Sequence, residues 1–121
     1  MYFEFQPRSD RGPAWAPSVD VCEKQKEIVI LVEIPGVAKS DIQLSWKEST
    51  LVISGHKPEQ FLRHQAARFL CVERTYGHFQ REIDIHVPID RGNATAELKD
   101  GLLKIRLPKI ARNEPEDIPI L

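Results

Sequence analysis

Residues 27–34 read Glu27-Ile28-Val29-Ile30-Leu31-Val32-Glu33-Ile34, and this stretch decides the fold. β-Branched residues favour strands, and a strand that is apolar at consecutive positions has to be covered on both faces. Pro35-Gly36 then ends the run, because proline cannot donate to a sheet and glycine favours a turn. We therefore expect a central strand that anchors the core of a β protein.

The rest of the chain from residue 18 repeats short β-type runs separated by turn residues. Two runs alternate and place apolar residues on one face: Ile42, Leu44 and Trp46 in the first, and Ala94, Ala96 and Leu98 in the second. Asp100-Gly101 is a strong hairpin signal, with 102–107 as the returning strand. The remaining runs are 18–22, 51–53 closed by Gly55, 68–74, and 79–87. This rhythm predicts six to eight strands in a sandwich or a barrel.

Size and charge narrow the class of protein. The chain has 121 residues, 41% of them hydrophobic, which suits one domain with a modest core. Its 17 basic and 18 acidic residues give a net charge of −1, which argues against nucleic acid or anionic lipid as a partner. Residues 1–7 lack the pattern of a secretory leader, and no stretch approaches membrane-spanning length, so we expect a cytoplasmic protein. Cys22 and Cys71 lie in expected strands without a CxxC spacing, which favours reduced thiols.

Residues 1–17 are predicted to be an N-terminal arm. They contain four of the nine aromatic residues, Tyr2, Phe3, Phe5 and Trp15, together with three prolines. This composition disfavours regular structure and exposes apolar aromatic side chains, so we expect an arm that becomes ordered on contact with a partner. Packing on the domain edge is the alternative, and it is at least as well supported for Trp15.

Residues 109–121 are predicted to be a C-terminal extension with an isolated apolar motif, Ile118-Pro119-Ile120, before Leu121. Pro119 favours an extended backbone, in which the two isoleucines point to the same side. Their burial yields on the order of 3–6 kcal/mol before ordering costs, so docking into a groove should be exchangeable. The span 109–118 reaches roughly 33 Å when extended, enough for a neighbouring subunit. Two other arrangements of the extension are equally compatible with the sequence: it folds back on its own domain, or it frays.

Patterns of catalytic chemistry are missing from the sequence. No glycine is followed by lysine, which excludes a P-loop, and no Gly-x-Ser-x-Gly elbow occurs. His56, His64, His78 and His86 lie on separate loops or strand ends, with no spacing that would set two imidazoles on one metal, so we interpret them as surface residues. The carboxylates are scattered on the solvent-facing sides of strands and form no general acid–base pair. We therefore expect no enzyme activity, no metal and no cofactor.

Five segments, in this order, resemble the small heat-shock protein family of bacteria and plants over nearly all of residues 14–121. They are Trp15-Ala16-Pro17-Ser18-Val19-Asp20-Val21, Glu33-Ile34-Pro35-Gly36-Val37, Glu73-Arg74-Thr75-Tyr76-Gly77-His78-Phe79, residues 96–108 around Asp100-Gly101, and Ile118-Pro119-Ile120. Five such segments in the family's order are hard to obtain by chance.

The resemblance implies an all-β, immunoglobulin-like sandwich, the α-crystallin domain, at 18–108. It implies that the long connection 56–75 carries a dimer strand that swaps onto the edge strand of a partner chain. The dimer strand is Arg68, Phe69, Leu70, Cys71, Val72, Glu73 and Arg74, and the partner's edge strand is Ser18, Val19, Asp20, Val21 and Cys22. The resemblance also implies that Ile118 and Ile120 dock in a groove lined by Leu44, Trp46, Ala96 and Leu98.

In that family the arm and the groove hold unfolding client proteins without ATP, in assemblies of strand-swapped homodimers. The arm is shorter here than is usual in the family, which leaves the subunit number and the client capacity open. A disulfide between Cys22 and Cys71 across the dimer is also open. The competing interpretation is a co-chaperone or interaction module on the same sandwich without holding activity.

Overall fold

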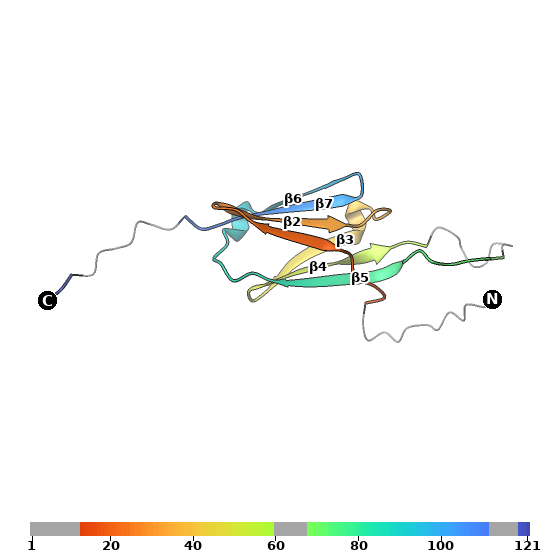
Figure 1. Cartoon of the computed structure of the whole chain (residues 1–121), viewed down its shortest axis with the longest axis horizontal. Helices are drawn as coiled ribbons and strands as arrows, with labels where there is room; N and C mark the ends of the chain where they lie inside the picture. Colours follow the sequence, from red (N-terminus) through yellow and green to blue (C-terminus); the bar gives the residue numbers. More distant parts are fainter. Residues whose placement is uncertain (1–12, 60–67, 112–118) are drawn as a thin grey trace.

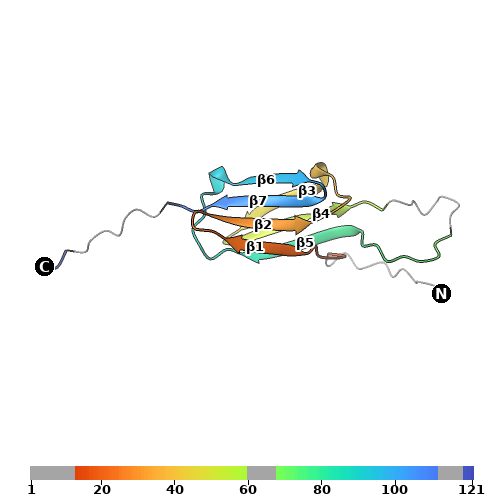
Figure 2. The same cartoon turned by 45° about the horizontal axis from the view of Figure 1, so that its top comes forward.

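The computed structural model describes residues 13–59, 68–111 and 119–121. Strands β1 (Val19–Glu23), β2 (Glu27–Glu33), β7 (Leu102–Pro108) and β6 (Thr95–Lys99) form one antiparallel sheet in that order. Strands β3 (Ile42–Lys47), β4 (Thr50–Lys57) and β5 (Gly77–Asp84) form a second antiparallel sheet. Short 3-10 turns, η1 (Lys39–Asp41) and η2 (Arg91–Asn93), lie on the two crossings between the sheets. Figures 1 and 2 show the sheets stacked as two layers, which confirms the predicted β-sandwich.

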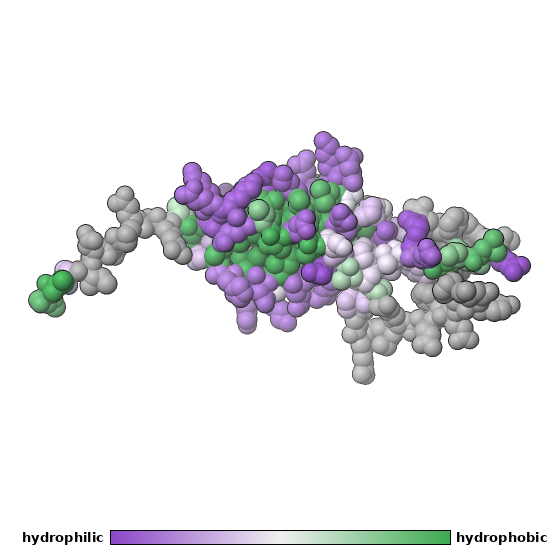
Figure 3. Space-filling view, viewed as in Figure 1, coloured by the Kyte–Doolittle hydropathy of each residue, from purple (hydrophilic) through white to green (hydrophobic). Residues whose placement is uncertain are grey.

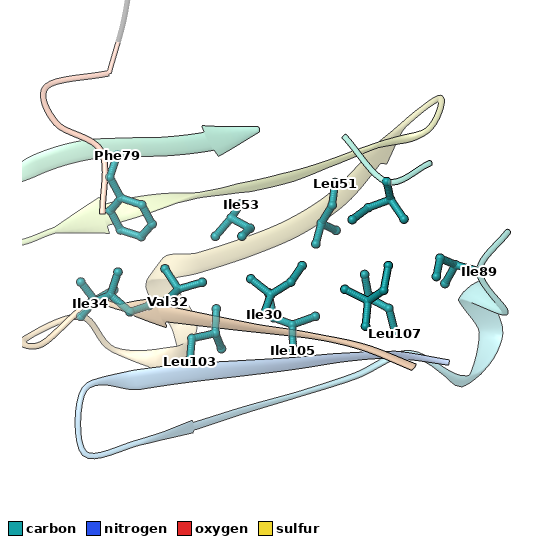
Figure 4. Close-up of a cluster of buried hydrophobic side chains, with 13 residues drawn as sticks. Ile30, Val32, Ile34, Leu51, Ile53, Phe79, Ile89, Leu103, Ile105 and Leu107 are labelled. Atoms are coloured by element: carbon teal, nitrogen blue, oxygen red, sulfur yellow. The ribbon is translucent and has the colours of Figure 1, made fainter. Parts of the chain in front are cut away.

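Apolar side chains of both sheets meet between the layers (Figure 4). Ile30 and Val32 of β2 and Ile53 of β4 are 0% exposed, and Phe79 of β5 is 1% exposed. Ile30 and Val32 lie two apart along β2, as inward-facing positions must. Burial of each such side chain contributes about 1.5–3 kcal/mol, so this layer is the main source of stability.

The expectation that the strand at 27–34 is covered on both faces holds only in part. Val29, on the outer face of β2, is buried, but Leu31 is half-buried. Their cross-strand partners on β7 are Arg106 and Lys104, long side chains whose aliphatic stems can cover apolar surface. The outer face of β2 therefore needs no third layer. No helix in the described part of the chain is long and apolar enough to cross a membrane.

The predicted hairpin at Asp100-Gly101 is confirmed between β6 and β7. Both turn residues have positive φ, 53° for Asp100 and 77° for Gly101, as a two-residue type I′ turn requires. A Cβ on Gly101 would lie 2.9 Å from the Cα of Pro35, and the Gly101 carbonyl accepts a 2.8 Å hydrogen bond from the Ile34 N–H. The turn is therefore packed against the end of β2.

Two strand boundaries differ from the predictions. Gly55 does not close a strand, since β4 continues to Lys57. A Cβ on Gly55 would lie 2.2 Å from the Asp41 carbonyl oxygen and 2.5 Å from the Phe79 ring, so this glycine permits close packing instead of a turn. The strand expected at 79–87 spans 77–84: the Ile85 N–H still bonds the Ser49 carbonyl, but Ser49 belongs to the turn before β4, so the ladder ends there.

Candidate functional site at the open edges of the sandwich

Strands β3 and β6 are the terminal strands of their sheets and lie along the same side of the sandwich (Figure 2). A terminal strand presents unpaired backbone groups on its outer side, which can pair with an added strand or peptide. This side of the fold is where the sequence predicted a groove for the tail and for clients.

The four residues predicted to line that groove share the inner side of these two strands. Leu44 lies opposite Ile53, and Ala96 lies opposite Ile105; since cross-strand partners point to one face, both are directed inward. Leu44 is nevertheless 38% exposed, and Ala96 is exposed as well. Trp46 and Leu98 are half-buried and pack against the core. We call Leu44, Trp46, Ala96 and Leu98 the β3–β6 edge.

One end of this edge opens into a cavity that the sequence did not suggest. Its volume is about 500 Å³, and its lining includes Trp46, Ile89, Arg91 and Ile110. The Arg91 guanidinium lies 4.1 Å from the centroid of the Trp46 ring and donates a hydrogen bond to the Glu48 carbonyl. Arg91 follows Trp46 by 45 positions, so only the folded arrangement of η2 and β3 brings the pair together.

The opposite side of the sandwich carries the second open edge, that of β1. The strand predicted at 18–22 is observed at Val19–Glu23, and its outer edge ends the sheet. Val21 is directed inward, opposite Ile30, yet it is 49% exposed. Figure 3 shows an apolar area on this face, in the region where Figure 1 draws β1 and β2, bordered by hydrophilic residues.

The predicted dimer strand, 68–74, is not a strand in this single chain. Phe69, Leu70 and Val72 within it are exposed, Leu70 by 81%. A strand requires a ladder with a neighbour, and the expected neighbour is an edge of another chain, whereas the structure describes one chain. Pairing of this segment therefore stays a prediction.

The predicted arm and tail lie largely outside the described residues, which exclude Tyr2, Phe3, Phe5 and Ile118. Trp15 is described, and it packs on the domain, 5.1 Å from the Phe79 ring, while its Nε1 donates to the Gly77 carbonyl at 3.2 Å. Trp15 therefore packs on the domain edge, which was the alternative to its belonging to a partner-binding arm. Pro119 and Ile120 are exposed at the other terminus.

The histidines that the structure describes, His56, His78 and His86, are exposed, as interpreted from the sequence, but two of them are not separate. His56 of β4 and His78 of β5 are directly opposite each other, and their ring centroids are 5.3 Å apart. The described residues contain no cluster of three or more His, Cys, Asp or Glu side chains that could hold a metal ion. Cys22 and Cys71 are both exposed and free.

Comparisons with known proteins find similarity along most of the chain. The Hsp20/alpha crystallin family matches residues 20–121. Spore protein SP21 of Stigmatella aurantiaca is 32% identical over 108 residues, covering 89% of this chain and 63% of that protein. Small heat shock protein C4 of Rickettsia felis is 34% identical over 105 residues, covering 87% of this chain and 64% of that protein. The chain thus spans less than two thirds of the length of these two relatives.

Among solved structures, a small heat-shock protein from Xylella fastidiosa superposes with a TM-score of 0.76 at 30% identity. The match covers 88% of this chain and 97% of that one, and the Xylella protein is described as having a distinct high order structure. The likeness therefore extends over the whole sandwich.

Proposed function

The chain belongs to the Hsp20/alpha crystallin family, and on that basis we propose that it is an ATP-independent holding chaperone that binds unfolding proteins and limits their aggregation. Holding of this kind is mass action: a surface that binds unfolded chains lowers their free concentration, and no chemical step is needed.

The observation that carries the proposal is the incomplete closure of the core at both sides of the sandwich. Leu44 at one side and Val21 at the other are directed inward but remain 38% and 49% exposed. Each lies on a terminal strand, so apolar surface and unpaired backbone groups occur together. An extended segment of an unfolding protein can satisfy both through added-strand pairing.

Exchange of strands between two chains is the first self-contact that we infer. Segment 68–74 presents three exposed apolar side chains, and β1 of a second chain offers a free edge. Addition of one to the other would extend the sheet of β1 and cover Val21. The resulting unit would be a symmetric homodimer, with two identical contacts of this kind.

Docking of the tail is the second self-contact that we infer. Ile118 and Ile120 of one chain would occupy the β3–β6 edge of a neighbour, next to Leu44 and Trp46. Ile120 is 99% exposed in the single chain, so its side chain is available for docking on another chain. Each contact is weak, but several around an assembly act together through a high effective concentration. The assembly can therefore release and expose its edges.

The holding activity can be tested with a heated client enzyme and stoichiometric chaperone in the absence of nucleotide. Light scattering should stay low with the wild-type chain and rise with Leu44→Ser, which removes apolar surface from the β3–β6 edge. Leu102→Ser is the matched control, because Leu102 is also a strand leucine, with 37% exposure, but lies outside that edge. A client that precipitates equally with and without the wild-type protein would refute the proposal.

Assembly is tested separately by mass. Replacement of Ile118 and Ile120 by alanine should reduce a larger assembly to dimers in multi-angle light scattering. Leu102→Ala, at an exposed leucine outside both the motif and the β3–β6 edge, should leave the mass unchanged. A wild-type protein that stays monomeric at high concentration would instead favour an interaction module without holding activity.

A further inference from the structure

His56 and His78 face each other at one of the closer positions of the β4–β5 ladder. The His78 carbonyl accepts hydrogen bonds from the backbone N–H groups of Ala14 and Trp15, at 2.8 and 3.3 Å. In an antiparallel ladder the N–H and C=O of one residue point to the same side, so His78 directs both groups away from β4. His56 and His78 are therefore a non-hydrogen-bonded pair, the class with the shorter Cα separation of about 4.5 Å.

The separation of the two rings matches the requirement of a shared metal ion. Metal–imidazole bonds of about 2.0–2.1 Å place each ring centroid roughly 3.2 Å from the ion, so the two centroids lie about 5.2 Å apart at the tetrahedral angle of Zn²⁺ and about 4.5 Å apart at the right angle of tetragonal Cu²⁺ or Ni²⁺. The observed centroids are 5.3 Å apart, and the ring planes are inclined by 64°. Two nitrogens can thus reach one ion by side-chain rotation alone, without a change in the backbone.

The surroundings of the pair also suit a cation. Both histidines are exposed, so water can fill the remaining coordination positions. The next pair along the same face is Ser54 and Gln80, which carries no charge. Lys57, the neighbour of His56 in the chain, points to the opposite face, where its Nζ lies 5.6 Å from the centroid of the Trp15 ring.

We propose that His56 and His78 form a two-histidine binding site for a divalent transition-metal ion of the imidazole-preferring class, Cu²⁺ most tightly and Zn²⁺ and Ni²⁺ less so. The site joins the end of β4 to the start of β5, at the base of the connection that carries the predicted dimer strand. A bound ion clips these two strands together and stabilises the native state, since the unfolded chain does not hold the two rings side by side.

The test uses the full chain with Cys22→Ser and Cys71→Ser, because exposed thiols compete for the same ions. Calorimetric titration with Cu²⁺ should give one site per chain, and electron paramagnetic resonance should show two coordinated nitrogens. Added Zn²⁺ should raise the unfolding temperature in a concentration-dependent way. His56→Asn or His78→Asn should each weaken Cu²⁺ binding by about tenfold or more, while the matched surface control His86→Asn leaves it unchanged.

The double variant His56→Asn/His78→Asn separates a shared site from two independent ones. For one shared ion, either single change removes most of the affinity and the second change adds little. Losses that simply add, equal binding by the His86→Asn and His56→Asn chains, or no binding by the wild-type chain would each overturn the proposal. Circular dichroism of each variant checks that the sheet is intact, and loss of holding activity is no readout of this site.

Discussion

Two phenylalanines ten positions apart should respond to the same substitution in opposite ways. Phe79→Ala removes a ring that is 1% exposed and that packs 5.1 Å from the Trp15 ring. Such a truncation in a core costs about 3–5 kcal/mol of unfolding free energy. Phe69→Ala removes a ring that is 44% exposed, in the predicted dimer strand, and should cost the folded domain about 0.5 kcal/mol or less.

Urea unfolding followed by tryptophan fluorescence measures this difference, since Trp15 lies against Phe79. With a urea slope of about 2 kcal/mol/M, Phe79→Ala should lower the midpoint by roughly 2 M. Phe69→Ala should instead lower the mass seen by light scattering, and its effect on the midpoint should grow with protein concentration, as it does when association is lost. A cost of less than about 1 kcal/mol for Phe79→Ala, or equal midpoint shifts for both variants at every concentration, would contradict these expectations.

Three smaller perturbations test the local geometry. Gly101→Ala should cost about 1–3 kcal/mol, because it places a Cβ 2.9 Å from Pro35 at a residue with φ of 77°; an unchanged thermal midpoint would contradict this. Gly55→Ala should be at least as destabilising, since its Cβ would lie 2.2 Å from the Asp41 carbonyl oxygen, and the variant should be recovered mostly in the insoluble fraction. Arg91→Ala should cost only about 0.5–1 kcal/mol but should change the fluorescence of Trp46, which it stacks upon; an identical spectrum would show that the stack does not persist in solution.

Much of the fold could be predicted because its signals are local. The apolar run at 27–34 is β2, the alternation of Leu44 and Trp46 is β3, and Asp100-Gly101 is the β6–β7 turn. Each signal depends on residues within a few positions of one another, where period-2 alternation or a required positive φ is visible in the sequence. The strand boundaries depend on tertiary contacts: the error at Gly55 arose because a strand glycine and a turn glycine look alike until the Phe79 ring is in place.

The candidate site also combines features that are local in the sequence with features that depend on the whole fold. The inward direction of Leu44 and Ala96 follows from alternation, and both residues were named from the sequence. Their exposure does not follow, because it depends on β3 and β6 being the last strands of their sheets. The stack of Arg91 on Trp46 lay beyond local reasoning for a related cause, as η2 and β3 belong to distant parts of the chain.

By itself, the sequence determined that this chain would form β-strands around one core, where its hairpin would turn, and which family it resembles, since these depend on neighbouring residues. Only the tertiary structure decided which strands end the sheets, how much of Leu44 and Val21 is exposed to solvent, and that His56 faces His78. The physical reason is register: pairing between strands that are far apart in the chain is set by the packing of the whole core, and a shift of one residue would have turned those side chains to other partners.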